Sequence, residues 1–155
     1  MFTFTVNESV TIDRPIEEVF NFIADGENDP RWCPSVEEIE QIAGNGAGPG
    51  TRYRMHHAPG GMNFDAIVEI VESNPPHSLK WIMTDSGHTL HGTYELEAVD
   101  GKTRLTQTSE ITFEGWLRIP GLIMKRFIAR DVKKELGKQF TNLKRILETE
   151  TEASR

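Results

Sequence analysis

The sequence lacks the features on which several common functions depend. Its only cysteine is Cys33, so no disulfide can form within the chain, and a reducing compartment is expected. The net charge of −7 argues against broad binding to nucleic acid or to an anionic membrane, because either needs clustered positive charge. No segment reaches the roughly 18 to 20 apolar residues of a membrane span, and the N-terminus does not resemble a signal peptide. We therefore expect a cytoplasmic protein with no nucleic-acid partner and no stable membrane insertion.

Motifs for metal binding and for several kinds of catalysis are also absent. The sequence has no HExxH motif, cysteine cluster, P-loop, serine hydrolase motif or dinucleotide fingerprint. Cys33 lies between Trp32 and Pro34, where no neighbour supplies a base, so a structural thiol is favoured over a nucleophile. His56 and His57 are adjacent on a predicted strand and point to opposite faces. We expect neither a metal ion nor a cofactor.

The 155 residues suit one domain with one core. We expect this domain over residues 1–150, followed by a polar tail over 151–155. Basic residues gather late in the chain, but they are interleaved with apolar residues at helical spacing. A solvated helix face explains them best.

The order of the predicted elements is strand, short helices, six strands and a long helix. Alternating apolar residues predict a strand over 2–12, and Pro15 with two following glutamates marks a short helix that ends near Asp25-Gly26. A turn or single helical turn over 28–34 follows, and the glycine-rich segment 44–50 is a predicted loop. The final helix begins between 117 and 120 and runs to about 148. The remaining strands are predicted over 36–43, 51–58, 62–73, 78–85, 88–98 and 102–113.

Three two-residue turns, Gly60-Gly61, Ser86-Gly87 and Asp100-Gly101, predict which side chains share a face of the sheet. All three give the same partition, which a one-residue slip would destroy. The inner face collects Tyr53, Met55, His57, Phe64, Ala66, Val68, Leu79, Trp81, Met83, Leu90, Tyr94, Leu96, Leu105 and Ile111. The outer face collects Arg52, Arg54, His56, Lys80, Thr89, His91, Thr93, Arg104 and Thr106. We expect an antiparallel meander on which the long helix buries its apolar face.

The predicted inner face is not purely aliphatic. Its polar members are His57, Asp85, His88, Tyr94, Gln107 and Ser109. A solid core would have to satisfy each of them with hydrogen bonds, whereas pockets for small molecules combine methionine and aromatic residues with a few polar groups. Gly92, between Trp81 and Ser109, leaves a gap in this wall. The residues alone leave open a ligand pocket and a packed core with polar residues at its rim.

Acid–base catalysis would need a titratable group inside such a pocket. The candidates are His57, His88, Asp85 and, on the long helix, Asp131. Because hairpin tips are solvated, Asp85 and His88 are interpreted first as an exposed turn pair.

Several segments, taken in order, resemble the START-like, birch-pollen-allergen-like (SRPBCC) superfamily in its polyketide cyclase/dehydrase branch. They are 12–20 (IDRPIEEVF), 32–36 (WCPSV), 48–53 (GPGTRY), 72–77 (ESNPPH) and 143–148 (LKRILE). The likeness covers nearly the whole chain and depends on order and spacing. It implies an α+β helix-grip fold, in which a curved seven-stranded antiparallel sheet surrounds a long C-terminal helix and two short helices lie between strands 1 and 2. It also implies a cavity between sheet and helix.

The resemblance favours the binding or transport of a small hydrophobic ligand, lipid-like or aromatic polyketide-like. The sequence leaves the oligomeric state open between a monomer and a homodimer. One alternative is a cofactor-independent cyclase or dehydratase that uses His57 or His88. Another is a protein-interaction module with a filled core and no ligand. The residues expected to line the cavity are Trp32, Tyr53, Met55, His57, Phe64, Ala66, Trp81, Met83, Leu90, Gly92, Tyr94, Gln107, Ser109, Met124, Phe127, Ile128 and Asp131.

Overall fold

The computed structural model describes residues 2–46, 48–58, 64–85, 88–113 and 118–153. They form one seven-stranded antiparallel sheet in the order β1-β7-β6-β5-β4-β3-β2, together with a long C-terminal helix. The strands are β1 (Phe2–Ile12), β2 (Val36–Ala43), β3 (Arg52–His57), β4 (Phe64–Asn74), β5 (Ser78–Thr84), β6 (His88–Val99) and β7 (Lys102–Phe113). The helices are α1 (Ile16–Ala24), the 3₁₀ turn η1 (Gly26–Asn28), α2 (Asp29–Trp32) and α3 (Arg118–Ala153). This is the predicted helix-grip architecture.

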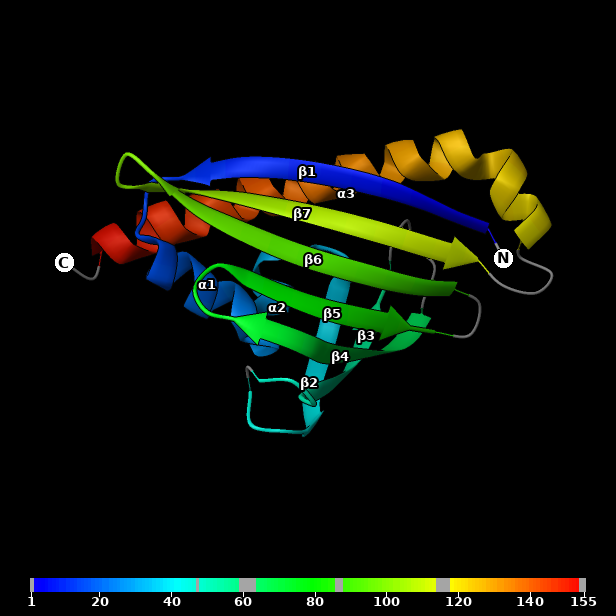
Figure 1. Cartoon of the computed structure of the whole chain (residues 1–155), viewed down its shortest axis with the longest axis horizontal. Coiled ribbons are helices and arrows are strands. Elements are labelled where there is room, and N and C mark those ends of the chain that lie inside the picture. Colours follow the sequence, from blue (N-terminus) through cyan, green and yellow to red (C-terminus); the bar gives the residue numbers. More distant parts are fainter. Residues whose placement is uncertain (1, 47, 59–63, 86–87, 114–117, 154–155) are drawn as a thin grey trace.

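All helices lie on one side of the curved sheet (Figure 1). Helix α3 packs mainly along β1 and contacts α2, while α1 reaches β6 and β7. The first turns of α3 extend past the ends of the neighbouring strands (Figure 1). Within the described residues, no helix is long and apolar enough to span a membrane.

The observed strand registers confirm the pairings predicted from the turns. Met83 lies opposite Leu90 and Trp81 opposite Gly92 between β5 and β6. The pairings across β6–β7 and β3–β4 also match, including Tyr94↔Gln107, Gly92↔Ser109, Met55↔Ala66 and His57↔Phe64. Asp100 and Gly101 both have positive φ values, as a type I′ hairpin turn requires. The Gly60-Gly61 and Ser86-Gly87 turns themselves lie outside the described residues.

The predicted faces of the sheet separate by burial. The described inner-face side chains are buried or partly buried, and basic residues such as Arg52, Arg54 and Arg104 are exposed. On α3, Leu136, Phe140 and Leu143 are buried at the predicted spacing, while the side chain of Leu122 lies outside the described part. The helix itself continues to Ala153, five residues beyond its predicted end near Glu148. Arg31 forms an ion pair with Glu150, which holds this last stretch against α2.

The interior contains two apolar clusters along the length of α3. The larger one joins α1, α2, most of the sheet and the C-terminal half of α3, and it includes Leu105 and Phe140. The second lies nearer the start of α3 and consists of Phe4, Val6, Ile111 and Leu136. On β7, the inner-face positions between Leu105 and Ile111 are occupied by polar residues, so a polar band separates the two clusters along this strand, while Leu90 packs against both.

Arg14 ties the connection between β1 and α1 to helix α3. Its Nε donates to the carbonyl oxygen of Leu147 at 3.1 Å, and a terminal nitrogen donates to the carbonyl oxygen of Glu148 at 2.5 Å. In turn, Thr103 Oγ1 donates to the carbonyl oxygen of Arg14 at 2.7 Å. Charge-assisted hydrogen bonds of this kind are stronger than neutral ones. They fix the end of the grip that carries α1 and α2.

Candidate functional site

An aromatic group lies at the centre of the inner face. The ring of Tyr94 lies between Trp32 and Trp81, with ring centroids 6.5 and 6.1 Å apart and both pairs tilted. The site depends on Gly92, because a Cβ atom there would come within 2.2 Å of the Trp81 indole ring. The glycine therefore allows the indole to lie against the backbone of β6 beside Tyr94.

Polar side chains on β7 fill the band between the two apolar clusters. Gln107 Nε2 donates to Ser109 Oγ at 3.1 Å, and both residues are almost fully buried. Among the described residues, Gln107 Oε1 is a buried atom with no hydrogen-bond partner. Buried polar atoms are normally paired, so an unpaired amide oxygen in the interior indicates a position suited to an external donor.

Asp29 is a functional candidate that the sequence analysis missed. It begins α2 and is partly buried. Burial of the carboxyl group, with a smaller contribution from Asp25, raises its pKa from 3.8 to about 8. The nearby Trp32 indole favours the ionised form, but its nitrogen does not reach hydrogen-bond geometry with a described acceptor. Asp29 is therefore mainly protonated at pH 7 and can donate a hydrogen bond or a proton.

Asp29 lies within electrostatic range of other buried groups. Burial raises the pKa of Tyr94 well above its ordinary value, and the negative charges of Asp29 and Cys33 raise it further. The pKa of the Cys33 thiol is likewise raised by burial, then by Asp29 and Glu135. Cys33 is thus a neutral thiol, as expected of a structural cysteine. Glu135 brings α3 into the same region, and its Oε1 is buried without a described hydrogen-bond partner.

The prediction that Asp85 and His88 form an exposed turn pair is wrong, because the two side chains are largely buried. Asp85 Oδ1 lies 3.0 Å from His88 Nδ1, and only 3% of the Asp85 side chain is exposed. The imidazole of His88 packs against the Phe113 ring, with the ring centroids 5.9 Å apart, and 22% of the His88 side chain is exposed. The sequence pattern placed both residues on the inner face but gave no indication of the contact with Phe113.

His57 lies on the inner face near the same pair. Burial lowers the pKa of His57, Asp85 opposes this change and a positive His88 reinforces it. His57 is therefore a neutral imidazole at pH 7. His56, on the other face, has its pKa raised by its hydrogen bond to Asp65. In the described part of the chain, no three His, Cys, Asp or Glu side chains are placed to hold a metal ion.

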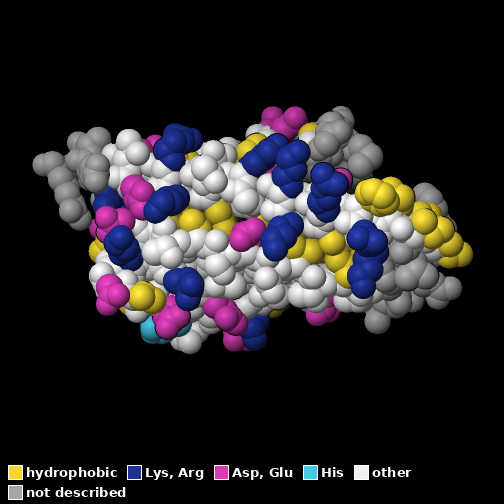
Figure 2. Space-filling view, turned by 90° about the horizontal axis from the view of Figure 1, so that it is seen from above, with side chains coloured by type: hydrophobic (Ala, Val, Ile, Leu, Met, Phe, Trp, Pro, Cys, Tyr) yellow, Lys and Arg dark blue, Asp and Glu magenta, His cyan; other side chains and the backbone are white. Residues whose placement is uncertain are grey.

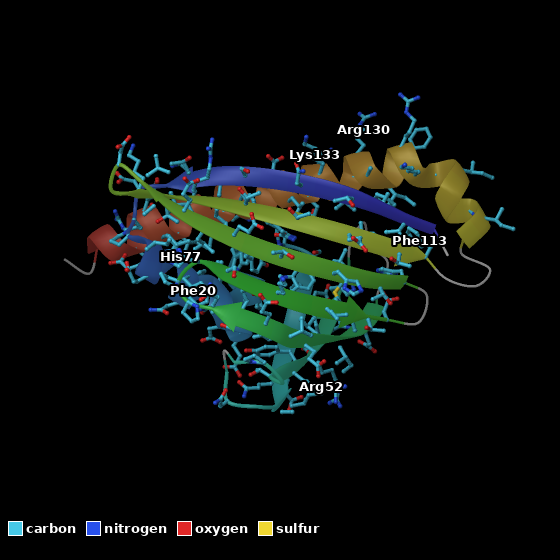
Figure 3. The ribbon with its side chains drawn as sticks, in the orientation of Figure 1. Phe20, Arg52, His77, Phe113, Arg130 and Lys133 are labelled. Atoms are coloured by element: carbon cyan, nitrogen blue, oxygen red, sulfur yellow. The ribbon has the colours of Figure 1, made fainter. Side chains whose placement is uncertain are left out.

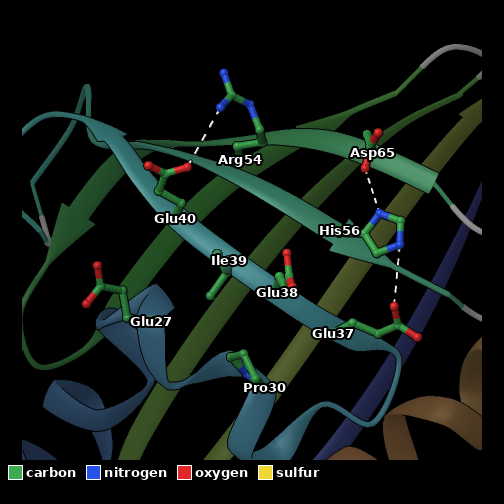
Figure 4. A pocket seen from close by; sticks show the side chains of 9 residues that line it. All are labelled: Glu27, Pro30, Glu37, Glu38, Ile39, Glu40, Arg54, His56 and Asp65. Carbon is green, nitrogen blue, oxygen red and sulfur yellow. Dashed lines mark hydrogen bonds and ion pairs between the residues drawn. The ribbon is translucent and has the colours of Figure 1, made fainter.

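Two open hollows lie outside the space between the sheet and α3. The larger, of about 560 Å³, borders the edge strand β2. In it, His56 bridges Asp65 at 2.7 Å and Glu37 at 3.4 Å, and Arg54 pairs with Glu40 at 3.7 Å (Figure 4). The second, of about 320 Å³, lies on the outer face of β3 to β5. The first is lined by charged pairs, and the second by the Arg52–Glu69 pair with Ile67, Ile82 and Thr84. Both lie outside the space between sheet and α3, so neither corresponds to the expected cavity, which remains a prediction.

Comparison of the sequence with models of known protein families identifies the family of this chain. The model of the polyketide cyclase/dehydrase and lipid transport family matches residues 3–148. The chain belongs to this family. No curated protein matches the sequence.

Several solved structures share the fold of this chain. A Thermus thermophilus protein is 21% identical, with a TM-score of 0.78 over 94% of this chain and 98% of its own. The Zhui aromatase/cyclase from Streptomyces sp. R1128 is 15% identical, with a TM-score of 0.74 over 94% of this chain and 96% of its own. A START superfamily protein from Mycobacterium smegmatis is 16% identical, with a TM-score of 0.70 over 97% of this chain and 99% of its own. At these identities the likeness establishes the fold alone.

In this member of the polyketide cyclase/dehydrase and lipid transport family, most predicted site residues come together on the inner face. The buried ones are Trp32, Tyr53, Met55, His57, Ala66, Met83, Gly92, Tyr94, Gln107 and Ser109. Trp81 and Leu90 are partly buried and pack against the larger cluster. Phe64 begins β4 at the predicted register position, but its side chain lies outside the described part.

The predicted residues on α3 separate from the others. Ile128 is partly buried against the second cluster. Met124, Phe127 and Asp131 are exposed. The structure does not bring these three side chains to the inner face. They lie on the exposed side of α3, whereas Ile128 and Val132 on its other side pack against the second cluster.

Proposed function

We propose that the protein binds a small hydrophobic molecule, lipid-like or aromatic, that carries at least one polar group, between the sheet and α3. The observation that carries this proposal is the set of buried polar atoms without hydrogen-bond partners among the described residues. They include Trp32 Nε1, Trp81 Nε1, Gln107 Oε1 and Glu135 Oε1. Each unpaired buried group costs free energy, so a ligand that pairs with some of them gains affinity.

The side chains around these atoms match the proposed ligand class. Trp32, Tyr94 and Trp81 supply aromatic surface with specific packing geometry. Met55 and Met83 supply adaptable apolar contacts. Such a combination of apolar wall and few polar groups is typical of small-molecule sites. The family description, which joins polyketide cyclases and dehydrases with lipid transport, supports the same class of ligand.

A displacement experiment tests this function. We expect the neutral fluorescent probe N-phenyl-1-naphthylamine to bind. We also expect 2-naphthol to displace it at a concentration roughly tenfold lower than naphthalene does, because a tenfold difference in affinity corresponds to the free energy that one buried hydrogen bond contributes. Gln107→Leu removes the unpaired oxygen and should abolish this preference while the probe still binds. Gln41→Leu is the control, because Gln41 lies on the edge strand β2 and donates to the carbonyl oxygen of Gly44 instead. If the probe does not bind the wild-type protein, or if Gln107→Leu leaves the preference intact, the proposal fails.

A second candidate function, proton transfer in a cyclase or dehydratase reaction, is favoured by Asp29. A carboxyl group with a pKa of about 8 beside a buried aromatic cluster is protonated at neutral pH and sheds its proton readily. We propose Asp29 as the acid for this function. The neutral His57 lies on the same inner face and suits the role of base.

A further inference from the structure

The first turns of α3 carry a group of exposed hydrophobic side chains. Ile119, Ile123 and Phe127 are 63%, 74% and 60% exposed, and Met124 is also exposed. The spacing of four residues places Ile119, Ile123 and Phe127 along one side of the helix. We call these four residues the apolar tip. Contiguous exposed hydrophobic residues at the end of a molecule generally mark an interaction site.

Basic side chains follow the apolar tip along the same helix. Between residues 118 and 138 the sequence has seven Lys or Arg and two Asp or Glu, a net charge of +5 in a chain of net charge −7. Arg130 and Lys133 project away from the sheet (Figure 3). Seen from above, hydrophobic side chains gather at the end where α3 begins, and Lys and Arg side chains lie beside them (Figure 2). We call Arg126, Arg130, Lys133 and Lys134 the basic collar.

The basic collar has no ion-pair partner among the residues that the structure describes. Arg126, Arg130, Lys133 and Lys134 are exposed, and none forms an ion pair with a carboxylate in the described ranges. Exposed lysines elsewhere do have such partners, as Lys80 has in Glu72. The collar therefore presents unpaired positive charge directly beside the apolar tip.

We propose that the apolar tip and basic collar dock the protein reversibly on an anionic lipid bilayer. Apolar residues on a helix insert at the boundary between headgroups and acyl chains, and neighbouring Lys and Arg residues bind the anionic headgroups. The rest of the chain carries a negative charge, which orients this end toward an anionic surface and repels the remainder. The proposal stands on the surface of α3 and does not depend on what binds inside the grip.

The charges favour a bilayer over a second copy of the chain. A symmetric dimer through this end would place two segments of net charge +5 against each other, which is unfavourable. The first turns of α3, where the tip begins, also extend past the ends of the neighbouring strands, which favours contact with a flat surface (Figure 1).

Vesicle sedimentation tests the docking surface. With vesicles of 30% phosphatidylglycerol in phosphatidylcholine, we expect at least tenfold stronger binding than with pure phosphatidylcholine, weakening as salt rises. Ile123→Ser with Phe127→Ser should weaken binding to the anionic vesicles about tenfold or more. Lys133→Glu with Lys134→Glu should remove the preference for them. Val71→Ser with Val99→Ser, which alters exposed valines on strands, is the matched control and should change binding less than twofold.

A second measurement separates insertion from adsorption. In a Phe127→Trp variant, brominated phosphatidylcholine in the anionic vesicles should quench the added fluorescence, while a Val71→Trp variant should show no added quenching. Equal binding of wild type and the Ile123→Ser, Phe127→Ser variant to anionic vesicles would overturn the proposal. So would a wild-type dimer, measured by light scattering, that the same variant converts to a monomer while neither binds vesicles. Binding only to an acidic protein, with no vesicle binding, would also overturn it.

Discussion

The Asp29→Asn variant is expected to be more stable than the wild-type protein at pH 8, by at least about 2 kcal/mol, and to match it near pH 4. The folded-state pKa of Asp29, about 8, lies above the ordinary value of 3.8. Between these values the folded protein keeps a proton that the unfolded chain releases. Wild-type stability therefore falls as pH rises through this range. Asparagine does not titrate, so the advantage of the variant grows from pH 4 to pH 8 and is constant above it.

Urea denaturation at pH 4, 6 and 8 measures this dependence. Asp131→Asn, an exposed carboxylate on α3, is the matched control and should change stability by less than about 0.5 kcal/mol at each pH. A difference between Asp29→Asn and wild type that stays the same from pH 4 to pH 8 would contradict the assignment. If the protein catalyses a proton transfer, the same variant should keep probe binding and lose turnover. A variant with higher stability and lower activity is expected when the replaced residue serves function at a cost in stability.

Gly92→Ala is expected to destabilise the protein by about 1 to 3 kcal/mol, because the added methyl group overpacks the aromatic group. The new Cβ atom would lie 2.2 Å from Cε2 and Cζ2 of Trp81, and a rigid indole can yield only by moving as a whole. Since Trp81 lies beside Tyr94, the displacement should also weaken binding of N-phenyl-1-naphthylamine. Denaturant unfolding followed by tryptophan fluorescence measures the first effect, and titration with the probe measures the second.

Gly137→Ala, the same substitution at another position, is expected to stabilise the protein. Gly137 lies within α3, and a Cβ atom there would meet nothing within 4 Å. Alanine is a better helix former than glycine, so this variant should gain about 0.5 to 1 kcal/mol of stability. If both variants changed stability in the same direction and by similar amounts, close contact between Gly92 and Trp81 could not be the cause.

The registers of the sheet were predictable because they depend on local features of the sequence. The Asp100-Gly101 turn pairs Val99 with Lys102, and alternation then assigns each following side chain to one face. The location of the aromatic group was predictable in the same way, because the register assigns Trp81, Gly92 and Tyr94 to the inner face. For the same reason Gln107 and Ser109 could be placed in the interior from sequence alone.

Residues whose environment is set by distant segments could not be placed in the same way. Asp29 owes its raised pKa to packing of α2 under the sheet, and nothing in its immediate sequence indicates burial. Asp85 pairs with His88, whose ring packs on Phe113, a residue that is close in space but distant in sequence from this hairpin. The periodicity of α3 showed an apolar surface wider than one face. It could not show which of these apolar side chains remain exposed in the folded protein, as Phe127 does.

The most direct test of ligand binding inside the grip is a titration of ¹⁵N-labelled protein with 2-naphthol, followed by nuclear magnetic resonance. Binding between the sheet and α3 predicts saturable shifts of the Trp32 and Trp81 indole N–H resonances and of the Gln107 side-chain amide. The exposed strand residues Arg52 and Thr84, beside the outer hollow, should not shift. Shifts confined to Arg52, Thr84 and their neighbours, or no shift of either indole at saturation, would contradict binding in the interior.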